Sequence, residues 1–313
     1  MKKLSLLATA TLFLILSACS PAAPAAAPAP AAPAAPAQAA APAPAAPAAP
    51  AAPESDFNAS RQINVISREE GSGTRDAFVE LLEIEVDGVD HTSLEADIAQ
   101  GTSVVIATVA GNTYAIGYIS LGSLNDTVQA VAIDGVSASP ATVQNGTYPV
   151  FRAFNLAVGD LSDVAQDFLD FVLSAEGQEI VAGRGYITVG ANPPAFTGGD
   201  VSGTVVVTGS TSIAGVMERL AEAYVALNPD ANVEVHSSGS GAGITAARDG
   251  TADIGMASRE LRDTELEYVA SVTMAFDGIA IIINNDNPVE SLSSEEVRRI
   301  FIGELTTWSE VHE

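Results

Sequence analysis

The sequence has little positive charge. Its 313 residues include 13 Lys+Arg against 39 Asp+Glu, which gives a formal net charge of −26 at pH 7. Both lysines, Lys2 and Lys3, lie at the extreme N-terminus, so residues 54–313 contain 11 arginines, no lysine and all 39 acidic residues, a net charge of −28. A surface this acidic repels DNA, RNA and anionic lipid, which excludes nucleic acid as a partner.

Residue types that serve metal or covalent chemistry are also scarce. Cys19 is the only cysteine, so the chain forms no internal disulfide and offers no second thiol for a zinc site or a catalytic pair. The histidines, His91, His236 and His312, lack metal-ligand spacing, and no Gly-x-Ser-x-Gly elbow surrounds the loop serines discussed below. We therefore expect no catalytic residues, no metal, no cofactor and no enzymatic activity.

Residues 1–19 are predicted to be a lipoprotein signal peptide. A basic start precedes a mostly apolar run over 4–16 and then small residues. That run of about 13 residues is too short to span a bilayer, which needs about 20. Leu16-Ser17-Ala18-Cys19 resembles the bacterial lipobox, in which the cysteine is acylated. Cys19 is therefore the predicted lipidation site, and the chain is expected to be an extracytoplasmic, membrane-anchored lipoprotein of the periplasm or cell surface.

Residues 20–55 are predicted to form an Ala/Pro-rich tether. Residues 21–53 are alanine and proline apart from Gln38, and they hold 11 of the 17 prolines. Proline at this density stops helix formation and favours extended polyproline II, which rises about 3.1 Å per residue. The tether would thus reach roughly 100 Å between the lipid and the folded part.

After residue 54, short apolar runs alternate with amphipathic stretches, a pattern that favours an α/β fold. Helices are predicted over 161–173, after Thr74 and after Ser212, because apolar residues recur on one face at helical spacing. These faces comprise Phe78, Leu81 and Leu82 after Thr74, and Ile213, Val216, Met217, Leu220 and Tyr224 after Ser212. Residues 277–284 are a predicted buried strand, and Ser293 with Glu296 forms a capping-box pattern before a further helix.

Three runs are predicted strands that turn into helices through glycine and hydroxyl residues: 63–67 before Arg68–Thr74, 204–208 before Gly209–Ser212, and 233–235 before Ser237–Gly243. At such turns the free N–H groups and the helix dipole stabilise an anion without a basic residue. One such loop is usually an ordinary helix N-cap, but three in one chain, without a Gly-Lys-Ser/Thr phosphate loop, indicate a small free oxyanion.

Further motifs, taken with these loops, resemble the periplasmic phosphate-binding proteins of ABC transporters. The likeness covers residues 61–311 and is carried by these stretches: Ser67–Phe78, Ala115–Ser120, Phe171–Gln178, Gly209–Ser212, Gly239–Gly243, Ala252–Leu261, Asp277–Ala280 and Phe301–Trp308. The resemblance implies an α/β, two-lobed periplasmic-binding-protein fold, type II-like, with the ligand in the cleft between the lobes. It also implies inorganic phosphate as the ligand and ABC transporter permease subunits as partners.

The motifs do not follow the family's order. Residues 61–190 resemble the family's later half and 203–311 its earlier half, which predicts a circularly permuted chain in which Ala191–Gly203 joins the old ends. The alternative is a truncated tandem pair, two half-copies that need a partner chain. With permutation, the predicted domains are the signal peptide 1–19, the tether 20–55, a discontinuous lobe 56–151 plus 284–313, and a continuous lobe 152–283.

The family's motifs assign the phosphate-binding residues by position, as Arg68, Ser72, Gly73, Thr74, Thr211, Ser212, Ser240 and Ser258. Arg68 supplies the one full positive charge, and the family pattern also allows it a salt bridge to Glu70. Some family members have an aspartate at the position of Ser258, where it accepts the proton that distinguishes phosphate from sulfate. Glu70 or Asp277 is the predicted replacement, and Arg259 is left out of the site.

The sequence thus predicts a solute-binding protein that captures inorganic phosphate for an ABC importer. It leaves open a binder of another oxyanion, such as sulfate or molybdate, and a stand-alone phosphate scavenger or sensor. A phosphatase-like enzyme is less favoured, because Glu69 and Glu70 lie beside Arg68 and are better explained as its partners. The acidic surface does not conflict with this prediction, since the loops and the arginine act locally on the anion.

Overall fold

The computed structural model describes residues 57–198 and 201–312. The predicted signal peptide, the lipidation site Cys19 and the tether lie in 1–55, outside the described residues. The described residues belong to one compact unit. Among the helices of the described ranges, none combines the length and apolar character needed to cross a membrane.

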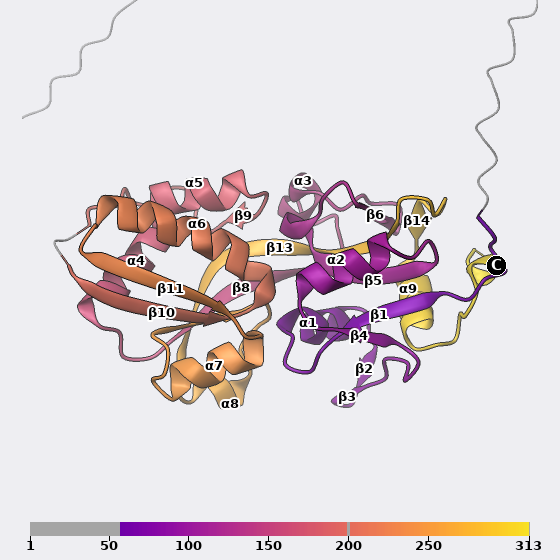
Figure 1. Cartoon of the computed structure of the whole chain (residues 1–313), viewed down its shortest axis with the longest axis horizontal. Helices are drawn as coiled ribbons and strands as arrows, with labels where there is room; N and C mark the ends of the chain where they lie inside the picture. Colours follow the sequence, from indigo (N-terminus) through magenta and orange to yellow (C-terminus); the bar gives the residue numbers. More distant parts are fainter. Residues whose placement is uncertain (1–56, 199–200, 313) are drawn as a thin grey trace, which may run out of the picture. The chain divides into compact units, whose positions relative to one another are not determined.

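The compact unit has two lobes, each with its own hydrophobic core. The first core gathers buried residues from 63–150 and 279–311, and the second gathers residues from 154–275. We call the elements around the first core lobe A and those around the second lobe B, and Figure 1 shows them as two groups. Residues 279–283, which the sequence analysis assigns to the continuous lobe, pack in the first core.

Lobe A is assembled from two stretches of the chain. The first contains β1 (Asn64–Arg68), α1 (Gly73–Leu81), β2 (Glu85–Val86), β3 (Val89–Asp90), β4 (Asp97–Ala99), α2 (Thr102–Ala110), β5 (Ala115–Ser120), a 3₁₀ turn (Leu121–Ser123), β6 (Val128–Ala130), β7 (Ala132–Ile133) and α3 (Pro140–Gln144). The second contains β14 (Ser291–Leu292), α9 (Ser294–Phe301) and a 3₁₀ turn (Trp308–Glu310). The predicted capping box of Ser293 and Glu296 is present at the start of α9.

Lobe B is continuous in sequence. It contains β8 (Phe151–Val158), α4 (Asp163–Leu173), α5 (Ala175–Gly183), β9 (Ile187–Thr188), β10 (Gly203–Gly209), α6 (Thr211–Leu227), β11 (Ala231–Ser237), α7 (Ser240–Arg248), β12 (Ile254–Ala257) and α8 (Asp263–Leu266). The helical spacing predicted one buried face on α6, and its members are all buried: Ile213, Val216, Met217, Leu220 and Tyr224.

One sheet runs through both lobes, and β13 (Ala270–Asn284) is the strand that they share. Its order is β11-β10-β12-β8-β13-β5-β1-β4. The first part of β13 pairs antiparallel with β8, and its last part pairs antiparallel with β5. β10 runs parallel to β11, and β1 runs parallel to β4. Because each of these four strands leads into a helix, four helices begin at the carboxyl ends of parallel strands, where such sheets bind ligands.

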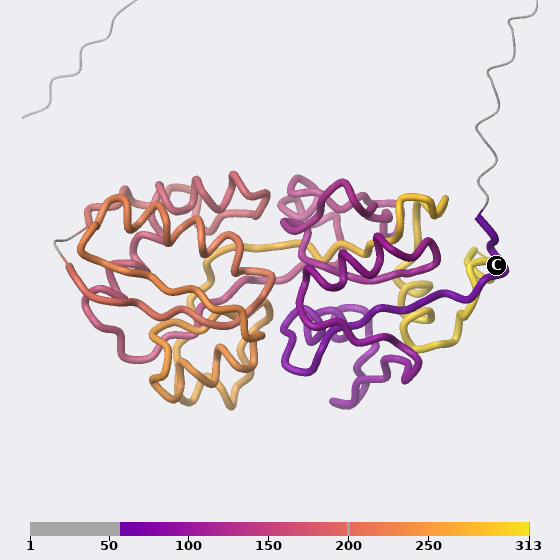
Figure 2. Tube along the Cα trace, viewed as in Figure 1, coloured from indigo at the N-terminus to yellow at the C-terminus, as the bar shows by residue number. Residues whose placement is uncertain are grey.

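The two ends of the described chain meet on lobe A. Ile63 N–H donates to Thr306 O at 2.8 Å, and Ser309 N–H donates to Ala59 O at 2.8 Å. We call these paired segments, 59–63 and 306–309, the terminal seam, and the tube in Figure 2 shows its yellow end beside its indigo start. The seam closes lobe A by hydrogen bonds without a peptide bond between the two segments.

Candidate functional site

Four helices begin where the lobes meet, α1 and α2 in lobe A and α6 and α7 in lobe B. Thr74 Oγ1 of α1 lies 2.9 Å from Ser212 Oγ of α6, and Thr102 Oγ1 of α2 lies 3.2 Å from Thr211 Oγ1 of α6. The first N–H groups of a helix have no acceptor within the helix, so their convergence creates positive potential at this point. The turns before α1, α6 and α7 are among those predicted from the sequence, whereas the turn before α2 is not, although Gly101-Thr102-Ser103 repeats the same pattern.

The start of α7 approaches the start of α1 very closely. A Cβ atom on Gly73 would overlap Ser240 Oγ, and it would lie 2.8 Å from Ser240 Cβ and 3.0 Å from Ser258 Oγ. Ser240 Oγ in turn accepts from Ser258 N–H at 3.1 Å. Gly241 N–H donates across the junction to Gly71 O at 3.1 Å. This contact therefore requires glycine at position 73 and buries both serines.

Arg68 ends β1 inside the junction, with 1% of its surface exposed. Its Nε and NH2 donate to the two carboxylate oxygens of Glu69 at 2.8 and 2.7 Å, and NH2 also donates to Thr211 Oγ1 at 3.1 Å. The predicted alternative partner was Glu70, but Glu70 is exposed and the carboxylate that holds Arg68 is Glu69. Arg68 NH1 is buried and has no hydrogen-bond partner.

The Glu69 side chain also contacts the start of α2, where its Oε2 accepts from Gly101 N–H at 3.1 Å. Burial alone would raise the pKa of Glu69, but the Arg68 hydrogen bonds and charge, with the Gly101 N–H, outweigh burial and lower it. Glu69 therefore stays ionised and supplies the negative charge that the N-terminus of α2 stabilises.

A second arginine, Arg152, is buried beside the predicted residue Ser212, whereas the sequence motifs point to Arg68 alone. Arg152 lies at the start of β8, and its NH2 lies 3.4 Å from Ser212 Oγ and 3.2 Å from Asp277 Oδ2. Burial raises the pKa of Asp277 to about 6, although the charge of Arg152 opposes the rise. The available sequence signal was an arginine within the apolar run of β8, a strand that the sequence analysis did not predict.

The structure brings the predicted residues together. Arg68 bonds to Thr211 and Thr74 bonds to Ser212, so two hydrogen-bonded pairs lie at the start of α6, and Gly73, Ser240 and Ser258 form a close contact at the starts of α1 and α7. Ser72 differs from the others, because its Oγ accepts from Arg75 N–H at 3.4 Å and so caps its own helix. Of the two predicted proton acceptors, Asp277 bonds to Arg152, which contacts Ser212, whereas Glu70 is exposed.

A cavity of about 500 Å³ opens beside the hydroxyl group of Thr211 and is lined from both lobes. Lobe A contributes the start of α2 and the turn at Gly122, and lobe B contributes Tyr186 and the start of α6. Arg184 lies at the same cavity, with its NH2 3.9 Å from where a Cβ on Gly215 would be. Two of the predicted site residues, Thr211 and Ser212, line this cavity.

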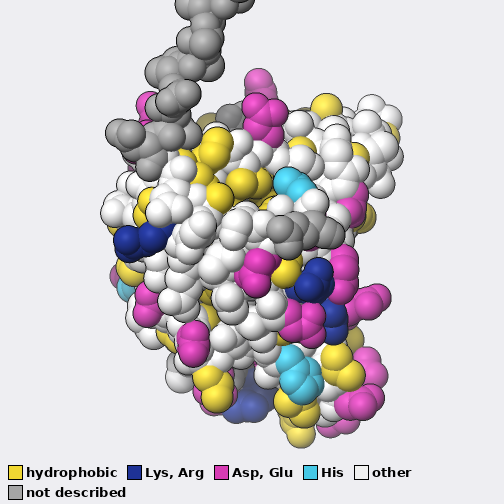
Figure 3. Space-filling model, turned by 90° about the vertical axis from the view of Figure 1, so that its right-hand side faces the viewer, with side chains coloured by type: hydrophobic (Ala, Val, Ile, Leu, Met, Phe, Trp, Pro, Cys, Tyr) yellow, Lys and Arg dark blue, Asp and Glu magenta, His cyan; other side chains and the backbone are white. Residues whose placement is uncertain are grey.

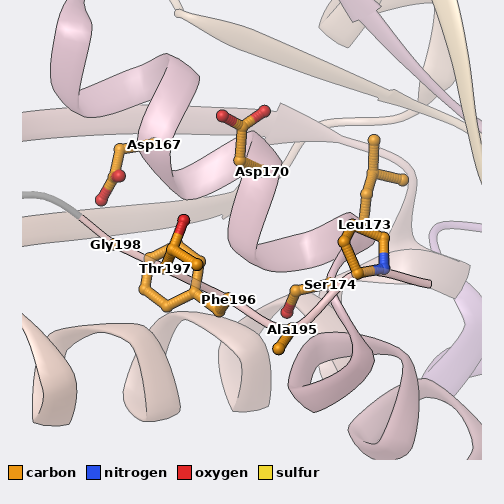
Figure 4. A pocket seen from close by; sticks show the side chains of 9 residues that line it. Asp167, Asp170, Leu173, Ser174, Ala195, Phe196, Thr197 and Gly198 are labelled. Carbon is orange, nitrogen blue, oxygen red and sulfur yellow. The ribbon is translucent and has the colours of Figure 1, made fainter.

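Other parts of the surface are less suited to an anion. A hollow of about 460 Å³ lies where 194–198 passes α4, and Asp167 and Asp170 project beside that segment (Figure 4). The face of lobe A in Figure 3 shows scattered acidic side chains with few basic ones. In the described residues, no three His, Cys, Asp or Glu side chains are grouped as a metal site. The basic groups suited to an anion are thus buried at the lobe junction.

Two α/β lobes that share a sheet and enclose buried polar residues between them define the class of two-lobed binding proteins. A family model of this class, described as "PBP superfamily domain", matches residues 50–176 and 194–312. "Phosphate-binding protein PstS 2" of Streptococcus pneumoniae is 46% identical over 259 residues, which cover 81% of this chain and 89% of that relative. A crystal structure of a phosphate-binding protein of a phosphate ABC transporter from Streptococcus pneumoniae is 45% identical, with a TM-score of 0.66 over 80% of this chain and 99% of that chain. "Phosphate-binding protein PstS" of Pseudomonas aeruginosa is 34% identical over 109 residues, which cover 32% of this chain and 34% of that relative.

The chain belongs to the PBP superfamily and, within it, to the PstS family of phosphate-binding proteins. The resemblance seen in the sequence motifs is thereby confirmed, as is the two-lobed α/β fold.

Proposed function

We propose that this protein is an extracytoplasmic, lipid-anchored solute-binding protein that captures inorganic phosphate for an ABC importer. The observation that carries the proposal is the buried group at the lobe junction, where helix N-termini from both lobes meet Arg68, whose NH1 has no partner. Such an enclosure suits a small oxyanion, since N–H groups, hydroxyls and a guanidinium all donate to it. The names of the relatives support phosphate as that oxyanion and a phosphate ABC transporter as the system served.

The proposed ligands divide by chemistry. Arg68 donates from its unpartnered NH1, a charge-assisted contact. Thr74, Thr211, Ser212, Ser240 and Ser258 offer hydroxyl groups. Ser72 and Gly73 contribute the backbone at the start of α1, with the Ser72 hydroxyl engaged in its cap. Asp277 is the proposed acceptor for the proton of phosphate, because it is the carboxylate hydrogen-bonded to the Arg152–Ser212 group.

The proposed location and partners follow from the same assignment. Acylation at Cys19 would hold the protein at the membrane through the tether, and permease subunits of the importer would receive the released phosphate. A catalytic role has little support. His236 and His312 are exposed, and their ring nitrogens lie 3.8 Å from a Glu234 carboxylate oxygen and 3.0 Å from a Glu296 carboxylate oxygen, so each is explained as a surface partner of a glutamate. The site hydroxyls bond to one another and to arginines, so none is paired with a general base in the way that a nucleophile requires.

We also propose that the chain is circularly permuted relative to part of its family, with lobe A built from two stretches joined at the terminal seam. The family model matches in two separate ranges, on either side of 177–193. The Pseudomonas aeruginosa relative aligns over about a third of each chain, as a linear alignment would do if the order differed. The Streptococcus pneumoniae relative aligns over most of both chains, so the proposed permutation would be shared with it. Both cores are complete within one chain, which does not favour half-copies that need a partner.

Calorimetric titration of the purified chain with phosphate and with sulfate tests the proposed function. We expect phosphate to bind with a micromolar or lower Kd and sulfate to compete far more weakly. Arg68→Ala should lose most of the affinity, because it removes a buried charge-assisted donor. The matched control is Arg219→Ala, since Arg219 is exposed and pairs with Glu222. Equal affinities for the two anions would contradict the phosphate assignment and leave a general oxyanion site.

A further inference from the structure

Arg152 and Asp277 face each other across the strands that connect the lobes. They are register partners in the antiparallel β8–β13 pair, at the point where the chain passes from one core to the other. Arg152 NH2 lies 3.2 Å from Asp277 Oδ2, and the two side chains are 3% and 1% exposed. Gly122 N–H donates to the other carboxylate oxygen at 3.4 Å. The pair is thus fixed at the base of the cleft, and its position does not depend on a flexible loop.

The hydrogen bonding of Arg152 is incomplete. Its Nε and NH1 are buried and have no partner, and its NH2 divides between Asp277 and the Ser212 hydroxyl. Arg68, by comparison, makes two short contacts to Glu69 and leaves one nitrogen without a partner. A buried guanidinium nitrogen without an acceptor is unfavourable. The Nε and NH1 groups of Arg152 are therefore available to donate hydrogen bonds to an anion.

The charges around Arg152 favour an anion as well. Burial lowers the pKa of Arg152 to about 10, the Asp277 charge opposes this, and the Arg68 charge adds to the lowering. Arg68 and Arg152 contact the hydroxyls of consecutive residues, Thr211 and Ser212, so two like charges flank the start of one helix. A negative charge between them relieves their repulsion.

We propose that Arg152 is a second cationic contact of the bound phosphate and that Asp277 is the residue that positions it. This inference rests on the proposed function and adds a residue that the sequence motifs do not include. Arg152 donates to the anion through a nitrogen that has no partner in the chain, while its contact to Asp277 holds the guanidinium beside Ser212. Asp277 balances the buried charge of Arg152 when the ligand is absent.

Calorimetric titration of inorganic phosphate into the full chain at pH 7 tests the inference with four variants. Arg152→Ala should weaken binding by about 10- to 100-fold, the usual effect of losing a hydrogen bond to a charged group. Arg152→Lys should retain part of the affinity, since a point charge remains without the planar fork. Asp277→Asn should weaken phosphate binding by a smaller factor than Arg152→Ala, because Arg152 keeps its charge but loses the carboxylate that positions it. It should also bring the affinity for sulfate closer to that for phosphate, because the proposed proton acceptor is removed. Arg219→Ala is the control on the surface.

The set separates a ligand contact from a structural ion pair. If the pair only stabilises the fold, Arg152→Ala and Asp277→Asn should lower the melting temperature and reduce affinity alike, and that result would overturn the inference. Wild-type affinity in folded Arg152→Ala would also overturn it. If Arg152→Ala does not fold, Arg152→Met/Asp277→Asn removes both charges and should fold yet still lose affinity. Absence of phosphate binding by the wild type is a different outcome, which rejects the proposed function and the inference together.

Discussion

Single atoms decide how closely the lobes meet. Gly73 is the clearest case, because a side chain there would overlap the Ser240 hydroxyl and lie 3.0 Å from that of Ser258. Ser240 cannot easily yield, since it begins α7 and accepts from Ser258 N–H. The glycine is thus required by the approach of two helix N-termini, and separation of the lobes is the simplest way to accommodate a larger residue.

We therefore predict that Gly73→Ala weakens phosphate binding by at least tenfold and leaves the fold intact. The added Cβ opposes closure of the cleft, while each lobe keeps its own core. Affinity measured by calorimetry, together with the circular dichroism spectrum, checks this outcome. Gly183→Ala is the matched control. Gly183 also lies in a helix, α5, but a Cβ at this position would have no atom within 4 Å. Tight phosphate binding by Gly73→Ala would show that the lobes need not approach this closely.

The residues of the site were predictable to the extent that they lie in local motifs. Arg68, Thr74, Thr211 and Ser212 follow strands within glycine-containing turns, and such turns are visible in sequence. Arg152 has no such context: its role depends on Asp277, 125 residues later in the chain, through strand register. Glu69, as the partner of Arg68, could not be chosen over Glu70, since the choice depends on which carboxylate reaches the start of α2.

At the scale of elements, α1 is linked to lobe B by ion pairs. Asp76 in its first turn accepts from Arg259 Nε at 2.9 Å and from Arg262 NH2 at 3.3 Å. Arg259 also bonds both carboxylate oxygens of Glu265 at 2.8 Å, so α8 fixes its direction. Arg259, which the sequence analysis left out, therefore faces lobe A and not solvent. The two contacts of Asp76 join lobe A to lobe B, so they exist only while the lobes touch, and they stabilise the arrangement that buries the site.

Asp76→Asn should consequently weaken phosphate binding by about two- to fivefold, the range expected for a partly exposed ion pair. The loss should appear as faster dissociation of phosphate in stopped-flow measurements, because the pair acts after the lobes have closed. Asp249→Asn, which removes an exposed pair within lobe B, is the control and should bind as wild type does. An unchanged dissociation rate in Asp76→Asn would mean that these contacts do not hold the cleft shut.

Elements were predictable where periodicity or capping is strong. α4, α6 and α9 appear as predicted because their buried faces or caps are encoded locally. In α1, Phe78 and Leu82 are buried as predicted, whereas Leu81 is 41% exposed. The strand predicted near 277–284 starts at Ala270 instead, because pairing with β8 extends it into lobe B. That extension is a tertiary effect, and β8 itself has an apolar run with no distinctive periodicity.

At the scale of the whole unit, the terminal seam tests the proposed permutation. We predict that a reordered chain, with 203–312 linked through a short flexible segment to 57–190, folds and binds phosphate within a few-fold of the natural order. The seam already places 59–63 against 306–309, so a short link does not strain lobe A. Phosphate calorimetry and the mass in solution, measured beside the natural chain, decide the outcome. A reordered chain that is insoluble or does not bind phosphate would contradict the permutation.

The shared strand β13 has a consequence for how the protein unfolds. Residues 279–283 of β13 belong to the core of lobe A, and Met274 and Ala275 belong to the core of lobe B. Because one continuous strand belongs to both halves of the sheet, melting of either core is expected to destabilise β13 in the other lobe as well. We therefore expect the two lobes to unfold as a single cooperative unit, although each has its own core.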